Sequence, residues 1–206
     1  MHHWQDKIKS ILRLIGVIAL IVVSLFIYRA CTSTNDSGGQ IMNVPAYNQG
    51  DYTQTVAVIN GENKSVKTSG CGAVALACVA QYITGSTKYD PQSLFEWANE
   101  HDFYNGNGLS HTALREMAAL YRLKAEWTSD EKQVLNSFKR RHPVIAHVGH
   151  GTFSTGTGHY IVLVGLNEDG KVVIHDPGSR KRSGNAYDLD FIVNQTKGDQ
   201  PFMIVR

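Results

Sequence analysis

The sequence has few cysteines. Its 206 residues include only Cys31, Cys71 and Cys78, too few for a dense disulfide framework. Cys71 and Cys78 are seven positions apart in a helical pattern. At the helical rise per residue, their sulfurs would lie roughly 10 Å apart along the axis, too far for a disulfide. We therefore expect no structural disulfide.

The sequence also has little excess of either charge. The formal net charge is +2, from 20 Lys and Arg against 18 Asp and Glu, which gives no basis for nucleic-acid binding. The only dense basic cluster, Arg180-Lys181-Arg182, is short, and we interpret it as a solvated loop. Hydrophobic residues make up 42% and charged residues 18% of the chain, as in an ordinary globular protein with an apolar segment attached.

Only one long apolar run occurs, near the N-terminus. Leu14 to Tyr28 carries no charge and follows a basic leader, a pattern typical of a secretory signal or a short signal anchor. No small-residue cleavage site follows the run, and bulky and charged residues precede Cys31 where a lipoprotein needs small ones. The sequence therefore predicts a transmembrane signal anchor over residues 11–29. A cleaved signal, a lipidated Cys31 and a buried core helix stay open as alternatives.

The charge distribution predicts how the chain is divided and oriented. Positive residues before the span outnumber Arg29 directly after it, so residues 1–10 should stay in the cytoplasm. Residues 30–40 are small and polar and are interpreted as a flexible linker. Residues 41–206 then form one domain of ordinary size, held on the outer side of the cell membrane by a single pass.

The pattern within residues 41–206 places helices first and strands afterwards. Apolar periodicity and capping residues predict helices at 71–85, 91–101 and 110–122, and a further helix that opens at Ser129-Asp130. Strands are predicted at 55–59, 143–148, 159–166, 171–176 and 202–205, with a hairpin turn at 167–170. This order predicts an α+β domain in which an N-terminal helical part packs on an antiparallel sheet.

Cys71 stands where a nucleophilic thiolate is expected. The turn residues Ser69-Gly70 precede it and a helix begins at or just after it, and a helix N-terminus lowers the pKa of a thiol. Gly72 should let the backbone approach a substrate carbonyl, so that N–H groups there stabilise an oxyanion. The alternative is a buried structural cysteine, which is how we interpret Cys78, in mid-helix among Ala and Val.

His159 and Asp176 are predicted to meet across a hairpin. His159 opens an apolar strand after the glycine-rich run 149–158. In a hairpin centred on residues 167–170, Asp176 lies opposite about residue 161, close to His159. A carboxylate there accepts a hydrogen bond from the imidazole and fixes its tautomer. For an isolated histidine, a structural role in the core or on the surface is the ordinary alternative.

These segments resemble the C39-like peptidase family of the papain-like superfamily. The resemblance covers about residues 43–180 and rests on VPAYNQ, SGCGAVALACVAQYITG, PVIAHVGHG and GHYIVLVGLNEDGKVVIHDP. It implies a papain-like fold in which Cys71 is the nucleophile, His159 the general base and Asp176 its orienting acid, without a metal or organic cofactor. In that family a Gln before the Cys commonly donates to the oxyanion. Gln49 is the better match here, because Ser65 occupies the position six residues before Cys71.

The resemblance implies a bacterial cysteine peptidase that hydrolyses peptide bonds of a peptide or protein substrate through a thioester, and the apolar run predicts that it is anchored in the membrane. A non-catalytic papain-like binding module and an acyltransferase or amidase with the same triad stay open. A zinc site at His147, His150 and His159 is disfavoured, since positions 147 and 150 of a strand face opposite sides. No P-loop motif is present, so the Gly-Gly specificity of the exporter-fused branch is not carried over. The substrate and the oligomeric state stay unknown.

Overall fold

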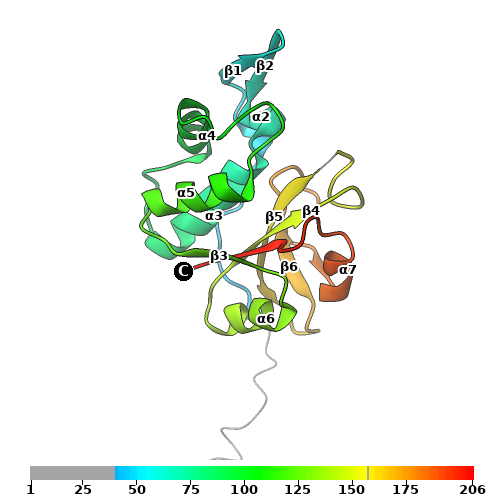
Figure 1. Cartoon of the computed structure of the whole chain (residues 1–206). Coiled ribbons are helices and arrows are strands. Elements are labelled where there is room, and N and C mark those ends of the chain that lie inside the picture. Colours follow the sequence, from blue (N-terminus) through cyan, green and yellow to red (C-terminus); the bar gives the residue numbers. More distant parts are fainter. Residues whose placement is uncertain (1–39, 157) are drawn as a thin grey trace, which may run out of the picture. The chain divides into compact units, whose positions relative to one another are not determined.

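A computed structural model describes residues 40–156 and 158–206, which form an α+β domain (Figure 1). The predicted signal anchor at residues 11–29 lies outside the described residues, as do Cys31 and nearly all of the predicted linker. Within the described part of the chain, no helix is both long enough and apolar enough to cross a membrane.

The four longer helices of the domain follow the predicted pattern. They are α3 (Cys71–Thr84), α4 (Pro91–Glu100), α5 (His111–Leu120) and α6 (Glu131–Lys139). Their caps explain their boundaries. The side chains of Asp90 and Ser110 accept hydrogen bonds from the backbone N–H groups of Ser93 and Ala113, and Gly85 ends α3 in the left-handed conformation.

Six antiparallel strands form the main sheet, in the order β3-β8-β4-β5-β6-β7. They are β3 (Ala125–Thr128), β4 (Val144–Val148), β5 (His159–Leu166), β6 (Val172–His175), β7 (Ala186–Tyr187) and β8 (Phe202–Val205). Val162 of β5 pairs with His175 of β6, so the hairpin has the register predicted from its turn. The short helix α7 (Leu189–Val193) follows β7. Figure 1 shows α3, α4 and α5 gathered on one side of the sheet strands, with α7 on the other.

The segment that leads to Cys71 contains structure beyond the prediction. A short 3-10 helix, η1 (Gln49–Asp51), and a short helix, α2 (Val66–Ser69), flank the hairpin of β1 (Thr55–Ile59) and β2 (Glu62–Ser65). The sequence predicts β1 and a turn at residues 61–63, whereas the chain turns at Asn60 and Gly61, with φ angles of 51° and 78°. Asn-Gly is the favoured pair for a two-residue hairpin turn, and Glu62 therefore already pairs with Ile59 as the first residue of β2.

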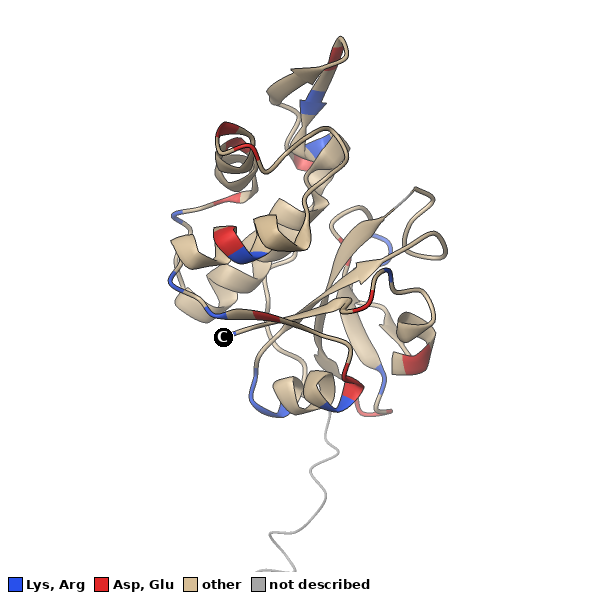
Figure 2. Cartoon of the chain, in the orientation of Figure 1, with Lys and Arg blue, Asp and Glu red and all other residues tan. Residues whose placement is uncertain are grey.

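The core lies where α3 packs on the sheet. Residues 72–80 of α3 and 159–165 of β5 are all buried, and neither element carries a Lys, Arg, Asp or Glu (Figure 2). A Cβ on Gly72 would lie 3.0 Å from Leu114 Cδ1 and 3.2 Å from a ring carbon of Tyr160. The glycine therefore permits close packing of α3 against α5 and β5.

Candidate active site

Cys71 is the first residue of α3, directly after a tight connection from α2. A Cβ on Gly70 would lie 2.6 Å from the Cα of Val66, so this connection requires glycine. The first N–H groups of a helix have no partner within the helix, and they surround Cys71 with positive partial charge. Cys71 is partly buried, whereas Cys78, two turns further along α3, is buried.

His159 and Asp176 form a direct hydrogen bond, with 2.8 Å between Nε2 of the imidazole and Oδ1 of the carboxylate. The two side chains are 10% and 0% exposed. Because Asp176 occupies Nε2, the Nδ1 atom is the ring nitrogen left for Cys71. The backbone N–H of Gly178 also donates to Oδ1, at 2.8 Å, and Nε of Arg182 donates to Oδ2, at 2.5 Å. Both carboxylate oxygens are therefore held in place, and the imidazole is aligned by them.

The pKa values of these groups favour an ion pair between cysteine and histidine. Burial works to raise the pKa of Cys71, but hydrogen bonding and charge from His159 outweigh it and lower the pKa. Burial works to lower the pKa of His159, but its bonds to Asp176 and Cys71 raise it to about 9. By contrast, burial raises the pKa of Cys78 to about 12. Of the two cysteines in the described part of the chain, Cys71 is therefore the one whose thiol ionises more readily.

Asp176 remains ionised in spite of its burial. Burial works to raise the pKa of the carboxyl group, but hydrogen bonds and charge from His159 and Arg182 lower it below the ordinary value. A negative charge beside Nε2 in turn stabilises the imidazolium form of His159. Asp176 therefore stays charged, the raised pKa of His159 favours its protonated form, and the lowered pKa of Cys71 favours its thiolate.

Gln49 reaches the same site from η1. Its backbone N–H donates to the carbonyl of Pro177 at 2.9 Å, which fastens η1 to the segment just after Asp176. Its side-chain Nε2 donates to the carbonyl of Lys67 at 2.8 Å, leaving a second N–H on the same nitrogen. The Oε1 atom is buried and has no hydrogen-bond partner within the described chain. Ser65, which stands six residues before Cys71, caps the start of α2.

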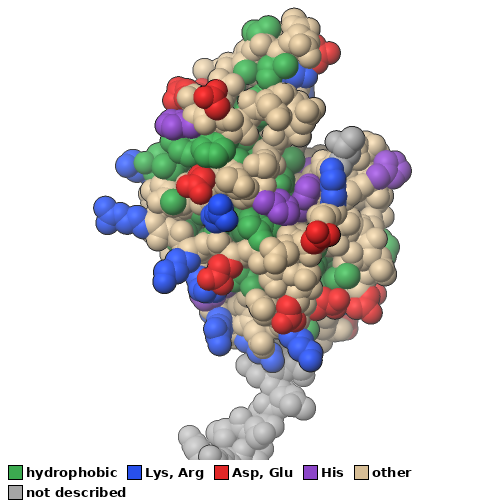
Figure 3. All heavy atoms as spheres, viewed as in Figure 1, with side chains coloured by type: hydrophobic (Ala, Val, Ile, Leu, Met, Phe, Trp, Pro, Cys, Tyr) green, Lys and Arg blue, Asp and Glu red, His purple; other side chains and the backbone are tan. Residues whose placement is uncertain are grey.

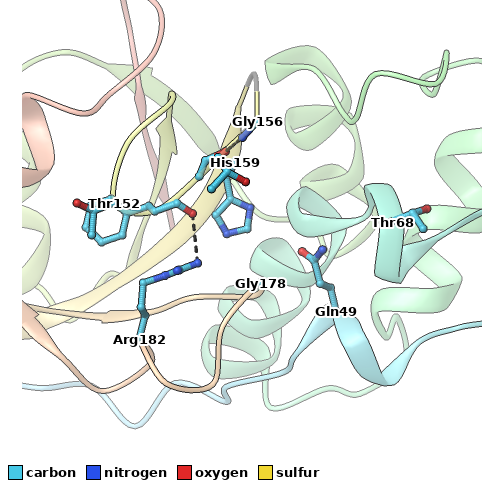
Figure 4. A pocket seen from close by; sticks show the side chains of 10 residues that line it. Gln49, Thr68, Thr152, Gly156, His159, Gly178 and Arg182 are labelled. Atoms are coloured by element: carbon cyan, nitrogen blue, oxygen red, sulfur yellow. Dashed lines mark hydrogen bonds between the residues drawn. The ribbon is translucent and has the colours of Figure 1, made fainter.

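A pocket of about 400 Å³ opens beside His159. Its walls are Gln49, Thr68, the loop 152–156, Gly178 and Arg182. Figure 4 shows Gln49 and Arg182 on opposite sides of the His159 ring, with the loop residues Thr152 and Gly156 beyond it. A Cβ on Gly178 would lie 3.2 Å from the ring carbon Cε1 of His159, so a side chain at position 178 would press against the imidazole.

The family follows from a comparison with known proteins. The model of the Peptidase_C39 like family matches residues 41–198. The chain belongs to this family. It is therefore a member of a cysteine peptidase family, as the sequence resemblance indicated. No curated protein matches the chain.

Solved structures confirm the α+β fold of this C39-like chain. A candidate C39-like peptidase from Bacillus anthracis is 20% identical with a TM-score of 0.58, covering 82% of this chain and 98% of that one. The peptidase domain of Streptococcus ComA, a bifunctional ABC transporter involved in quorum sensing, is 21% identical with a TM-score of 0.52, covering 68% and 90%. A double glycine motif protease from an AMS/PCAT transporter, in complex with the leader peptide, is 17% identical with a TM-score of 0.50, covering 80% and 92%. At these identities the likeness shows the fold.

In the pairing of β4 with β5, His147 lies opposite Tyr160, the residue next to His159. Nδ1 of His147 lies 3.0 Å from Nε2 of His111, and the His147 ring stacks on Tyr160 with 4.6 Å between centroids. Burial and nearby positive groups lower the pKa of His147 to about 4. Figure 3 shows histidine side chains reaching the surface between the helices and the strands. In residues 40–156 and 158–206, no group of three or more His, Cys, Asp or Glu is arranged to hold a metal ion.

Arg182 is the site residue that the sequence analysis missed. The cluster at residues 180–182 was interpreted as a solvated loop, and this is wrong for Arg182, which binds the buried Asp176 carboxylate and lines the pocket. The interpretation as a solvated loop holds for Arg180, which forms an ion pair with Asp51 and is 66% exposed. The turn sequence Asp-Pro-Gly at 176–178 is a signal for this contact, because such a turn brings the residues that follow it back beside the Asp176 carboxylate.

Proposed function

We propose that the chain is a cysteine peptidase that hydrolyses peptide bonds with Cys71 as nucleophile, His159 as general base and Asp176 as the residue that orients the imidazole. The observation that carries this proposal is the 2.8 Å hydrogen bond from His159 Nε2 to Asp176. It leaves Nδ1 for the sulfur at the N-terminus of α3 and supports a thiolate–imidazolium pair, the reactive state of such sites.

In the proposed first step, the Cys71 thiolate attacks the carbonyl carbon of the scissile peptide bond and forms a C–S bond. The carbonyl oxygen becomes an oxyanion, held by the backbone N–H of Cys71 and the second Nε2 hydrogen of Gln49. As the C–N bond breaks, Nδ1 of His159 gives its proton to the leaving amine. The products are a free amine and a thioester on Cys71.

In the second step, His159 takes a proton from water, which attacks the thioester. The same two N–H donors hold the second oxyanion, the C–S bond breaks, and Cys71 leaves as a thiolate beside the re-formed imidazolium. The carboxylic acid product departs. Asp176, held by Arg182 and Gly178, keeps the imidazole in one orientation through both steps.

The peptidase is further proposed to be anchored in the cell membrane by residues 11–29, with its domain outside the cytoplasm. The support is the uncharged run with its basic leader and the weaker positive charge after it. A peptide or protein substrate is supported by the related protease whose structure contains a leader peptide. The chain needs no metal or organic cofactor for the steps described.

The first test is alkylation of the whole chain with iodoacetamide across pH, with Cys71 followed by mass spectrometry. We expect Cys71 to react at pH 6, because its thiolate is paired with His159, and to lose that reactivity in His159→Ala. Cys78→Ala is the matched control, since Cys78 is buried and its pKa is raised, and it should leave the Cys71 profile unchanged. Titration of Cys71 as an ordinary thiol, near pH 8.5, with or without His159, contradicts the peptidase.

A further inference from the structure

The pocket beside His159 is polar and carries positive charge. Its ten lining residues include Arg182 and His159, three threonines and a serine, but no Asp or Glu. The carboxylate of Asp176, which pairs with Arg182, is fully buried and does not line the pocket. A ligand group that enters this space therefore meets a guanidinium and hydroxyls, a setting that suits a carboxylate.

The proposed mechanism decides which part of a substrate enters the pocket. His159 delivers its proton to the leaving amine, so the residue that carries this amine must lie against the imidazole. Except for Gln49 and Thr68, the pocket walls belong to the sheet half of the domain, which also carries His159. The pocket is therefore on the leaving-group side of the scissile bond.

Arg182 has hydrogen-bonding capacity left for a substrate. Of its five N–H groups, the Nε hydrogen goes to Asp176 and one Nη2 hydrogen goes to the carbonyl of Phe153, at 3.3 Å. No residue of the described chain is seen to accept from Nη1. The side chain is 32% exposed, and Arg182 is one of the residues that line the pocket (Figure 4). The contacts with Asp176 and Phe153 hold the guanidinium in one orientation before a substrate arrives.

We propose that this pocket is the leaving-group subsite and that Arg182 there binds the carboxylate of an acidic residue, Asp or Glu, immediately after the scissile bond. This proposal rests on the proposed peptidase function, since it uses the same His159 to define the leaving group. Arg182 would then have two roles: it positions Asp176 through Nε and selects the substrate through Nη1.

The test uses two peptides that mimic the leaving product, Glu-Ala-Ala-Ala amide and Gln-Ala-Ala-Ala amide, each with a free N-terminus. Each peptide is added to the whole chain, and protection of Cys71 from iodoacetamide is measured by mass spectrometry. The Glu peptide should protect at a concentration about tenfold lower than the Gln peptide, as a charge-assisted hydrogen bond predicts. The ratio of the two protecting concentrations is independent of the intrinsic reactivity of Cys71.

Three variants isolate the contribution of Arg182. In Arg182→Gln the two peptides should protect equally, whereas in Arg180→Gln, which changes an exposed arginine paired with Asp51, the tenfold ratio should persist. In Arg182→Lys, which keeps the charge, part of the ratio should remain. Equal protection by both peptides in the unmodified chain, protection by neither, or a ratio that survives Arg182→Gln overturns the proposal.

The peptidase itself is judged by a separate measurement, the pH profile of Cys71 alkylation without peptide. A reactive Cys71 at pH 6 together with equal protection by the two peptides would leave the peptidase standing and remove the acidic specificity. An ordinary thiol profile together with a tenfold ratio would remove the peptidase mechanism and retain an acidic ligand at Arg182.

Discussion

Asp176 connects the other residues of the candidate site through its hydrogen bonds. Its carboxylate accepts from His159, from the backbone of Gly178 and from Arg182, while its backbone N–H donates to Ser183 Oγ at 2.9 Å. A buried carboxylate is costly unless its oxygens are paired in this way. The arrangement therefore fixes the orientation of His159 and also keeps the negative charge that raises its pKa.

Replacement of Asp176 by Asn should move the reactivity of Cys71 to higher pH. Asn keeps an oxygen acceptor but loses the charge, so the pKa of His159 falls from about 9. Less imidazolium is then present near neutral pH, and the thiolate of Cys71 is less stabilised. We expect the midpoint of Cys71 alkylation by iodoacetamide to rise by about one pH unit.

The control for this change is Asp169→Asn, which alters an exposed carboxylate in the β5–β6 turn and should leave the midpoint in place. An Asp176→Asn variant with the same midpoint as the unmodified chain would mean that the charge of Asp176 does not act on Cys71 through His159.

At the scale of helices and strands, the elements with strong local signals were predictable from the sequence. α3 to α6 have apolar periodicity with capping residues such as Asp90 and Ser110, and the β5–β6 hairpin has a clear turn between two apolar strands. That turn fixed the register, and the register brought Asp176 next to His159. Such features depend on neighbours in the chain, so one sequence is enough to infer them.

The elements that were missed depend on contacts between distant parts of the chain. β3 pairs only with β8, some 75 residues later, and its sequence, Ala125 to Thr128, is short. The two-residue strand β7 is defined by β6. Likewise, Gln49 meets Pro177 and Lys67 through backbone carbonyls, contacts that no spacing in the sequence reveals. Arg182 differs from these cases, because it contacts Asp176 only six residues away and the Asp-Pro-Gly turn between them was a local signal.

A glycine at a strand irregularity connects the entry segment to the sheet. Gly165 lies at a register shift in β5 and has a φ angle of 124°, and it bridges Ile41. A Cβ there would lie 2.0 Å from the carbonyl oxygen of Gln40. Since Met42 N–H donates to Val164 O at 2.7 Å, this contact fixes where the chain enters the domain on its way to Gln49.

Gly165→Ala should therefore destabilise the domain by about 2–4 kcal/mol, because it adds a steric clash with backbone to an unfavourable φ angle. The matched control is Gly170→Ala. Gly170 also has a positive φ, 75°, but a Cβ there meets nothing within 4 Å, so the expected loss is only about 1 kcal/mol. Denaturant unfolding of the two variants measures the difference, and equal losses would refute the steric argument.

At the scale of the whole molecule, the entry point and the candidate site lie at opposite ends of β5. The chain enters beside Gly165, near the end of the strand, and His159 is its first residue. Six residues of strand separate them by roughly 20 Å. On the face in Figure 3, both Lys or Arg and Asp or Glu side chains lie at the surface.

The anchor is tested in a bacterial host that produces the whole chain. We expect the protein to sediment with membranes after an alkaline carbonate wash, and Val22→Arg to release it, because a charge at the middle of a short apolar run costs about 2.5–3.5 kcal/mol of insertion free energy. Ser33→Arg adds the same charge within the predicted linker and should leave the protein in the membrane fraction. Labelling of Cys71 on intact spheroplasts with a membrane-impermeant charged thiol reagent then tests the orientation. Labelling before lysis places the peptidase domain outside the cytoplasm, whereas labelling only after lysis reverses the predicted topology.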